Sequence, residues 1–361
     1  MKNWTKWCGK ILIFGKNLMC LVARIKRLLV RQSQPCSLCE QSAFQDQSQK
    51  AKRQEQHRGG KASLYVPNSL KRKKISLILI AFIFFIISEK PACAIKIGLY
   101  DNIMQNYIAV SNDGVIINGE TNQTIVAIRP MVKYILQKYN DKISISVNNK
   151  YYDLGSDKII IQAESAGFVS TKNKWYRGSI LVINNGHGLT FVNDIPLEYY
   201  LLGVVPSEMP SGWNIEAHKA QAIAARSYAL ANLGKRASKG YDLTDTPADQ
   251  AYGGASSETQ KTNSAVIETQ GLVMTYNNKI IPAYYHSSSG GHTLNSGDVW
   301  NKNLPFIRSV SSYDSNVPKK GHGIGMSQYG ANNLANNGLS AYQILGYFYN
   351  NISFNRVNTG L

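Results

Sequence analysis

A glutamate between two prolines has a setting that suits acid–base chemistry. Glu208 stands in Val205-Pro-Ser-Glu-Met-Pro210, where each proline fixes its own φ and restricts the residue before it. Desolvation on a stiff, partly apolar turn raises the pKa of a carboxyl group, whereas the start of a following helix favours the anion. Two interpretations stay open: Glu208 is a general acid/base, or it helps to cap that helix.

A second polar cluster contains two histidines within a Gly/Ser-rich stretch. His286 and His292 lie in Tyr-Tyr-His-Ser-Ser-Ser-Gly-Gly-His-Thr, residues 284–293. Two histidines without a nearby cysteine leave a zinc site short of ligands, and the GxSxG elbow of many serine hydrolases is missing. A turn with one structural histidine is the alternative.

A third cluster is the glycine-rich block Gly-His-Gly-Ile-Gly-Met-Ser-Gln-Tyr-Gly, residues 321–330. Its glycines would let the backbone approach a ligand closely, and His322 and Gln328 offer side-chain hydrogen bonds. The spacing does not match a dinucleotide-binding loop. A tight turn into a helix remains the alternative.

These clusters need an element to position them, and the alanine-rich segment 214–233 is predicted to be a buried central helix. Asn214 can cap its start and Gly234 can end it. Lys219 and Arg226 are seven residues apart and share one helix face, so they are candidates for a polar cleft or for a solvated surface. Asp249 is a further candidate that could equally form a turn.

The pattern along the chain predicts an α+β fold. Short β-branched runs between residues 95 and 195 predict strands, and Asn184-Asn-Gly186 predicts a hairpin turn. Helices are expected at 257–269 and from Ser340, which opens a capping-box pattern. We expect a β-rich region at 95–190, then a catalytic domain at 191–361 with an Ala-rich central helix and further helices.

Charge and cysteine are concentrated at the N-terminal end. Residues 1–94 hold 18 of the 40 Lys and Arg, 4 of the 22 Asp and Glu, and all five cysteines. A nucleic-acid binder needs its cations on the folded surface, so the net charge of +18 does not indicate nucleic acid here. Cys36 and Cys39 form an isolated CxxC without the second pair that zinc usually needs.

The N-terminal end also carries a targeting pattern. A basic cluster at 71–74, an apolar run at 75–87 and Ala92-Cys-Ala94 predict a signal peptide at 65–94, cleaved after Ala94. An uncleaved anchor is the alternative. Residues 1–64 are expected to be a disordered extension or the result of a misplaced translation start. The mature protein would be exported to the periplasm or cell wall.

Five blocks in order resemble the stage II sporulation protein D / amidase-enhancer family. They are PLEYYLLGVVPSEMP at 196–210, EAHKAQAIAARSY at 216–228, DQAYG at 249–253, YHSSSGG at 285–291 and GHGIGMSQYGA at 321–331. The resemblance covers roughly residues 180–350. It implies a lytic transglycosylase acting on the MurNAc–GlcNAc bonds of peptide-stripped peptidoglycan, with Glu208 as the single acid/base.

The same resemblance indicates which residues contact the glycan. The expected substrate-binding residues in the matched blocks are Lys219, Arg226, Tyr228, His286, Ser287, Ser288, His322 and Gln328. Some members bind zinc through cysteine and histidine, but residues 95–361 contain no cysteine, so we expect no metal and no cofactor. The segment between Asp314 and Gly321 is shorter than is usual in the family, which bears on activity and substrate choice.

The partners expected from this resemblance are peptidoglycan glycan strands, and the family's other name adds a cell-wall amidase. Two functions therefore stay open, an enzyme that cuts the strands and a wall-binding activator of an N-acetylmuramoyl-L-alanine amidase. An enzyme requires Glu208, whereas a binding module does not.

Overall fold

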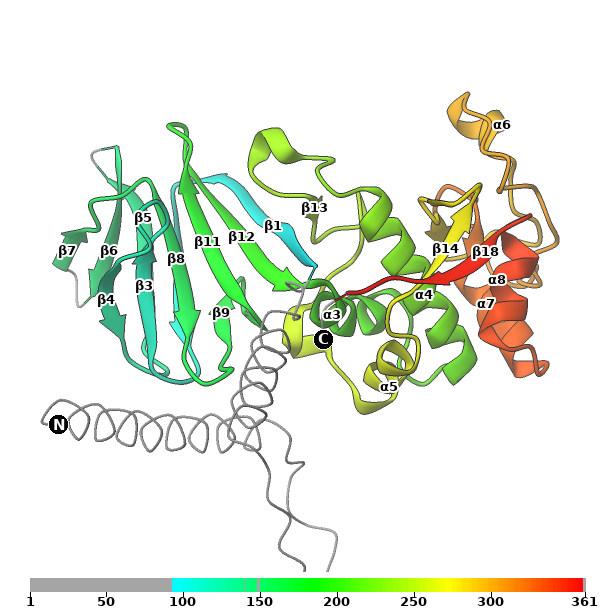
Figure 1. Cartoon of the computed structure of the whole chain (residues 1–361), viewed down its shortest axis with the longest axis horizontal. Helices are drawn as coiled ribbons and strands as arrows, with labels where there is room; N and C mark the ends of the chain where they lie inside the picture. Colours follow the sequence, from blue (N-terminus) through cyan, green and yellow to red (C-terminus); the bar gives the residue numbers. More distant parts are fainter. Residues whose placement is uncertain (1–92, 140, 148–149, 360–361) are drawn as a thin grey trace, which may run out of the picture. The chain divides into compact units, whose positions relative to one another are not determined.

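The computed structural model describes residues 93–139, 141–147 and 150–359, and it confirms the α+β class. The N-terminal half of this part is made of strands, and the helices follow from Leu197 (Figure 1). The expected extension at 1–64, the Cys36/Cys39 pair and the signal segment up to residue 92 lie outside the described residues. No helix within the described part is long and apolar enough to cross a membrane.

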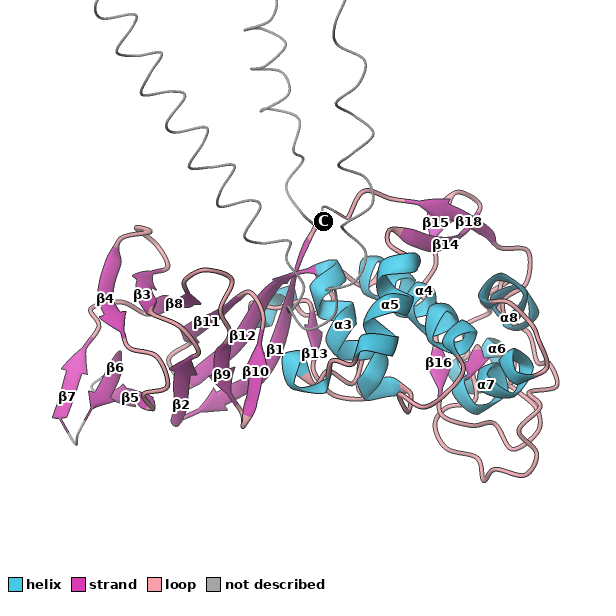
Figure 2. Ribbon diagram, turned by 90° about the horizontal axis from the view of Figure 1, so that it is seen from below, coloured by secondary structure: helices cyan, strands magenta, loops and turns pink. Residues whose placement is uncertain are grey.

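Two sheets face each other and share one apolar core (Figure 2). The seven-stranded sheet has the order β13-β1-β12-β11-β8-β3-β4. Its strands are β1 (Ala94–Ile103), β3 (Gly114–Asn118), β4 (Thr124–Ile128), β8 (Lys158–Ala163), β11 (Ser179–Asn184), β12 (Leu189–Pro196) and β13 (Leu243–Thr244). β12 crosses the expected domain boundary at residue 190, and that boundary stays a prediction.

The facing six-stranded sheet has the order β10-β9-β2-β5-β6-β7. Its strands are β2 (Gln105–Val110), β5 (Tyr134–Tyr139), β6 (Lys142–Val147), β7 (Lys150–Asp153), β9 (Val169–Thr171) and β10 (Lys174–Tyr176). Apolar side chains such as Ile108, Leu136 and Ile143 are fully buried between the sheets. The β-branched runs seen in the sequence therefore supply the interior of a two-sheet structure.

The hairpin predicted at Asn184-Asn-Gly186 joins β11 to β12. Gly186 has φ +87°, which a residue without Cβ adopts at no steric cost. The side chains of Asn184 and Asn185 accept hydrogen bonds from the backbone N–H groups of Gly186 and His187. Local turn chemistry thus fixes the register of two strands, and β12 leads directly into the first described helix.

The helical half is built around a central helix, α4. The helices are α3 (Leu197–Glu208), α4 (Ile215–Ala231), α5 (Gln260–Glu268), α6 (Ser296–Trp300), α7 (Gln328–Asn336) and α8 (Ala341–Phe348), with short 3-10 turns η1 (Ala237–Lys239) and η2 (Gly254–Ser257). α4 packs against α3, α5, α7 and α8. All its alanines except the terminal Ala231 are buried, which allows this close approach on several sides.

Helix ends follow the local sequence chemistry. Asn214 caps α4 by accepting from the N–H of Glu216, and Ser340 with Gln343 forms the predicted capping box of α8. The second predicted helix is α5, which begins at Gln260 rather than 257 because Thr259 is its cap. Small sheets complete this half, namely β14 (Leu272–Tyr276), β15 (Lys279–Ile280) and β18 (Ser353–Arg356) in one, and β16 (Tyr285–His286) with β17 (Met326–Ser327) in the other.

Candidate active site

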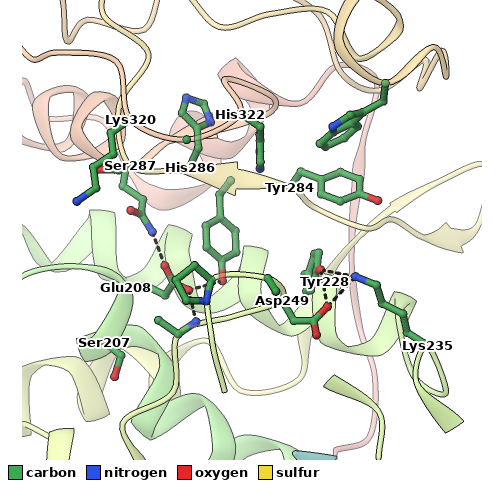
Figure 3. A pocket seen from close by; sticks show the side chains of 17 residues that line it. Ser207, Glu208, Tyr228, Lys235, Asp249, Tyr284, His286, Ser287, Lys320 and His322 are labelled. Carbon is green, nitrogen blue, oxygen red and sulfur yellow. Dashed lines mark hydrogen bonds and ion pairs between the residues drawn. The ribbon is translucent and has the colours of Figure 1, made fainter. Parts of the chain in front are cut away.

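A cavity of about 460 Å3 brings together most of the blocks that the sequence analysis singled out. It is lined by the end of α3, one residue of α4, the loop at 247–251, β16, and the glycine-rich segment with the first residue of α7. Figure 3 shows Glu208 on one side of this pocket and Asp249 with Lys235 on another. Segments far apart in the sequence therefore converge on one carboxyl group.

Glu208 is the last residue of α3, and neutral groups surround its carboxylate. Oε1 accepts a hydrogen bond from the N–H of Ala251 at 2.7 Å and one from the hydroxyl of Tyr285 at 3.3 Å. Oε2 accepts from Nε2 of Gln328 at 3.0 Å. No cation forms an ion pair with Glu208 within the described ranges. The three donors hold the carboxyl in place without neutralising it.

Burial raises the pKa of Glu208 above its ordinary value, and the hydrogen bonds from Ala251, Gln328 and Tyr285 only partly oppose this shift. The position at the end of α3 acts in the same direction as burial, because the C-terminus of a helix disfavours an anion. The expectation that Glu208 lies on a turn is wrong, because α3 extends to Glu208. Asn214, and not Glu208, caps the following helix, α4.

The glycine-rich block supplies Gln328 and brings it to Glu208. A Cβ at Gly325 would lie 2.0 Å from the carbonyl oxygen of Tyr284, and one at Gly330 would lie 2.1 Å from that of Ser312. These two glycines therefore allow the chain to approach its own backbone, whereas we had expected approach to a ligand. β17 pairs with β16, and Ser327 caps α7, so that Gln328 begins the helix at the pocket.

His286 and His322 lie close together in the pocket, with ring centroids 5.4 Å apart. Burial and the neighbouring His322 lower the pKa of His286 to about 4, and burial also lowers the pKa of His322. Nε2 of His286 is 2.6 Å from the hydroxyl of Ser289, and Nδ1 is 3.1 Å from the carbonyl oxygen of Ile324. Both rings are therefore neutral near pH 7, and the two ring nitrogens of His286 already form hydrogen bonds within the protein.

The serines after His286 have different positions. Ser287 lines the pocket, whereas Ser288 is buried and donates to the carbonyl oxygen of Pro318 at 2.6 Å. Ser288 also exchanges backbone hydrogen bonds with Lys320, which places Lys320 on the pocket wall. We expected Ser288 to contact substrate. Its hydrogen bonds instead attach the short segment after Asp314 to the loop that follows His286.

Asp314 is a buried residue that the sequence analysis did not assign to the site. Its carboxylate accepts from the N–H groups of Ser289 and Gly291 and from the hydroxyls of Ser312 and Ser327. Burial acts to raise the pKa of Asp314, but these hydrogen bonds outweigh it and lower the pKa. Asp314 therefore holds the His286 loop and the glycine-rich block together.

Asp249 lines the pocket as an ion-paired carboxylate. Lys235 and Arg236 donate to it at 2.6 and 2.7 Å, and the N–H and hydroxyl of Thr244 donate at 2.8 and 2.9 Å. Burial acts to raise the pKa of Asp249, but these hydrogen bonds outweigh it and lower the pKa. Tyr228, an expected substrate contact, also lines the pocket, and its hydroxyl accepts from Lys235 at 3.2 Å.

Lys219 and Arg226 do not line this pocket. They do share a helix face, but that face is turned toward α5. Lys219 pairs with Glu216 and with Glu268 at 2.8 Å each. Arg226 is fully buried and forms two hydrogen bonds with Glu198, at 2.8 and 2.7 Å. The expectation that these cations point into a cleft is wrong for the cavity around Glu208, because each is already paired with carboxylates.

Aromatic side chains form a wall of the pocket that the motif analysis missed. The rings of Tyr284 and Trp300 lie 4.5 Å apart, and Trp300 lies 5.1 Å from His322. Tyr285 is held by Gln250, which donates to its hydroxyl at 2.8 Å. A tyrosine pair next to a glycine-rich turn was visible in the sequence, but nothing there indicated that Trp300 folds back onto it.

No group of three or more His, Cys, Asp and Glu side chains suited to a metal ion occurs among the residues that the structure describes. Of the two histidines considered as metal ligands from the sequence, His286 lines the pocket and His292 does not. The expectation that the activity needs neither metal nor cofactor stays a prediction.

Comparison with known families gives one family match. Residues 185–276 match the model of the SpoIID family, stage II sporulation protein. The match includes α3, α4 and Glu208, and it confirms the resemblance stated from the sequence blocks.

Similar proteins carry related names. The chain is 40% identical over 128 residues to the amidase enhancer of Bacillus subtilis (strain 168), covering 36% of this chain and 17% of that protein. It is 41% identical over 144 residues to stage II sporulation protein D of the same organism, covering 36% of this chain and 42% of that protein. A protein of Brachyspira hyodysenteriae is 29% identical over 230 residues, with 63% and 57% covered. The matches thus span less than two thirds of each relative.

Proposed function

We propose that this chain, whose residues 185–276 form a SpoIID domain, is a peptidoglycan lytic transglycosylase with Glu208 as its acid/base. The observation that carries the proposal is the setting of Glu208. It lies in an open pocket, burial raises its pKa, and its hydrogen-bond partners are all neutral. Such a carboxyl group can hold a proton and release it to a substrate oxygen.

One carboxyl group is sufficient for a lytic reaction. The carboxylic acid of Glu208 gives its proton to the glycosidic oxygen as the bond from that oxygen to C1 of MurNAc breaks. The carboxylate then takes the proton of the C6 hydroxyl as that oxygen bonds to C1, which yields a 1,6-anhydro end and restores the acid. A hydrolase instead uses a second carboxyl group to attack C1 or to activate water.

Asp249 is poorly suited to that second role. Lys235, Arg236 and Thr244 already occupy its carboxylate, and they lower its pKa. A general base must have a lone pair within hydrogen-bond reach of the proton that it removes. The pairing of Asp249 therefore favours the intramolecular lytic route over hydrolysis.

The rest of the pocket suits a sugar chain. Tyr284 and Trp300 offer apolar ring faces, and His322 and Ser287 offer polar groups. Lys235 is bound to Asp249, whereas no acidic side chain pairs with Lys320 in the part of the chain that the structure describes. Lys320 would face the free lactyl carboxylate of a MurNAc residue that has lost its peptide.

A second candidate is a cell-wall-binding activator of an N-acetylmuramoyl-L-alanine amidase. The name of one relative, amidase enhancer, favours it, as does the short segment between Asp314 and Gly321, which leaves few residues to build that part of a cleft. We propose export to the periplasm or cell wall for either function, after cleavage at Ala94 or with the apolar run retained as an anchor.

The two candidates are separated by incubating the purified chain with peptide-free glycan strands and measuring the fragments by mass spectrometry. The enzyme releases short strands without any added protein. A chain that releases none, yet accelerates peptide release by an added purified amidase, supports the activator and excludes the lytic function. A chelator arm checks that neither result depends on metal.

A further inference from the structure

We infer that Gln221 and Gln328 form a coupled amide pair that reverses its hydrogen bonds when Glu208 gains or loses its proton. Gln328 touches the carboxyl group, and Gln221 acts through Gln328 as a positioning residue. The existence of the pair can be tested without any activity, whereas its use in catalysis rests on the function proposed above.

The two amides are placed as an ionised Glu208 requires. Nε2 of Gln328 donates to Oε2 of Glu208 at 3.0 Å and lies 3.5 Å from Oε1 of Gln221. Gln221 is fully buried in α4, and its Nε2 has no hydrogen-bond partner among the described residues. A carboxylate accepts only, so Gln328 must present its N–H group to it, and Gln221 must then present its oxygen. The unpartnered amide nitrogen is the consequence of a charged Glu208.

The proton of neutral Glu208 belongs on Oε2, next to this pair. Oε1 accepts from the backbone N–H of Ala251, which cannot become an acceptor. It also faces the hydroxyl of Tyr285, and because Gln250 donates to that hydroxyl, Tyr285 is free to donate in turn. Both partners of Oε1 are therefore donors, whereas the amide of Gln328 can offer either a donor or an acceptor.

Protonation of Glu208 gives the unpartnered amide nitrogen of Gln221 an acceptor. An O–H group on Oε2 requires an acceptor, which Gln328 provides when its amide turns and presents Oε1. Gln221 then turns as well and presents Nε2 to the same oxygen, so its buried N–H group gains a partner. The N–H groups of Gln328 leave Glu208 and Gln221 and turn to the pocket that Gln328 lines, where solvent can accept from them. The oxygen of Gln221 is left without a donor, which is a smaller cost than a buried amide N–H without an acceptor. The pair thus has one arrangement for ionised Glu208 and another for neutral Glu208, and its hydrogen bonds favour neutral Glu208.

Other ionisable groups near Glu208 must be separated from this effect. The hydroxyl of Tyr285 on β16 contacts it, and Tyr200 on α3 interacts with it electrostatically. Burial holds the pKa of both tyrosines well above the ordinary value. The charged or titratable groups on the remaining pocket walls are Tyr228, Lys235, Asp249, Tyr284, His286, Lys320 and His322. Gln221 is uncharged, so any influence that it has on the titration of Glu208 comes from hydrogen bonding.

The test is a titration of the full chain by NMR, with the side-chain carboxyl carbons of glutamate labelled with 13C and the Glu208 signal identified by its loss in E208Q. Methionine at position 221 keeps the shape but removes the amide. We expect Q221M to lower the pKa of Glu208 by about 0.5 to 1 unit. In a Q328M background the same change is expected to have no effect, because the contact that transmits it is gone.

Two outcomes would overturn the inference. One is a Glu208 pKa that Q221M leaves unchanged, and the other is an equal shift in the Gln328 and Q328M backgrounds. Thermal melting of each variant checks that it is folded.

A second measurement needs no variant at position 221. The side-chain 15N amide signals of Gln221 and Gln328 in the wild-type chain should titrate together with the Glu208 carboxyl. In E208Q, whose amide imitates the protonated acid, both signals should stay at their low-pH positions. If the two amide signals do not shift as Glu208 titrates, the inferred pair is refuted, whereas the proposed glycan cleavage is not affected. If the signals do shift but the chain cuts no glycan, only the proposed function is refuted.

Discussion

Two carboxylates line the same pocket in opposite electrostatic settings. Glu208 has only neutral donors around it, and burial raises its pKa. Asp249 is bound by Lys235 and Arg236, and these contacts lower its pKa. Figure 3 shows both on the walls of one cavity. Environments that move two pKa values apart separate the group that exchanges a proton from the group that stays ionised.

The difference teaches that exposure to a pocket does not by itself make a carboxylate catalytic. Asp249 uses its lone pairs to fix the loop at 244–249 beside α4, and it has little left to offer to a substrate. Glu208 keeps Oε2 bound by a single side-chain amide that can move. Replacing each of the two in turn should therefore have unequal effects on cleavage.

The largest effect is expected for E208Q. Glutamine keeps the shape but cannot donate and recover a proton, so glycan cleavage should fall by about 10²-fold or more. Stability should change by about 1 kcal/mol or less, because the amide oxygen can still accept from Ala251. Strand release is measured by chromatography and stability by thermal melting. An E208Q protein that cuts as fast as the wild type would remove Glu208 from the mechanism.

The pH dependence sharpens the same comparison. The raised pKa of Glu208 keeps the acid protonated above its ordinary range, and cleavage should fall about tenfold per pH unit once pH rises past that pKa. The stability linked to Glu208 is complete below its unfolded pKa and is lost as pH rises through the folded pKa. Melting temperatures should thus converge at low pH and favour E208Q at higher pH. A difference in melting temperature between the wild type and E208Q that does not change with pH would contradict a raised pKa of Glu208.

D249N is expected to have a smaller effect on cleavage and a larger one on stability. Removing the charge leaves Lys235 and Arg236 without their partner, which should cost about 2–4 kcal/mol. The wild-type contribution is present above the unfolded pKa of Asp249 and is lost as pH falls through its lowered folded pKa. Activity per folded molecule should fall less than tenfold. A loss as large as that of E208Q would make Asp249 a second catalytic carboxylate.

R226M should have the smallest effect on the chemistry. It removes a fully buried cation from Glu198, which should destabilise the protein by about 3–5 kcal/mol. The double change E198Q/R226M should recover part of that loss, because no unpaired charge remains. Below the melting temperature the folded R226M protein should cleave at nearly the wild-type rate. If folded R226M no longer binds glycan strands, Arg226 contributes to substrate binding and the prediction is wrong.

Local sequence chemistry predicted several elements correctly. The hairpin at Asn184, the cap at Asn214 and the capping box at Ser340 each depend on side chains that bond to backbone a few residues away. Such contacts can be recognised from spacing alone. The α+β class followed from the same short-range patterns.

The contacts missed from the sequence join residues far apart in the chain. Arg226 was expected in a cleft because Glu198, 28 positions away, could not be identified as its partner. Pro206 suggested a turn, yet α3 continues through it to Glu208, since Leu201, Val204 and Val205 are buried and hold the last turn. The role of Asp314 depends on four donors brought together by the fold.

The measurement that tests the central claim most directly is the mass of the products formed in water enriched in 18O. If Glu208 acts alone, the new MurNAc ends are 1,6-anhydro ends, one water lighter than a hydrolytic end and free of 18O. E208Q should form almost none of them. Reducing ends that carry one 18O would mean that water attacks C1, and they would contradict the single-carboxyl account.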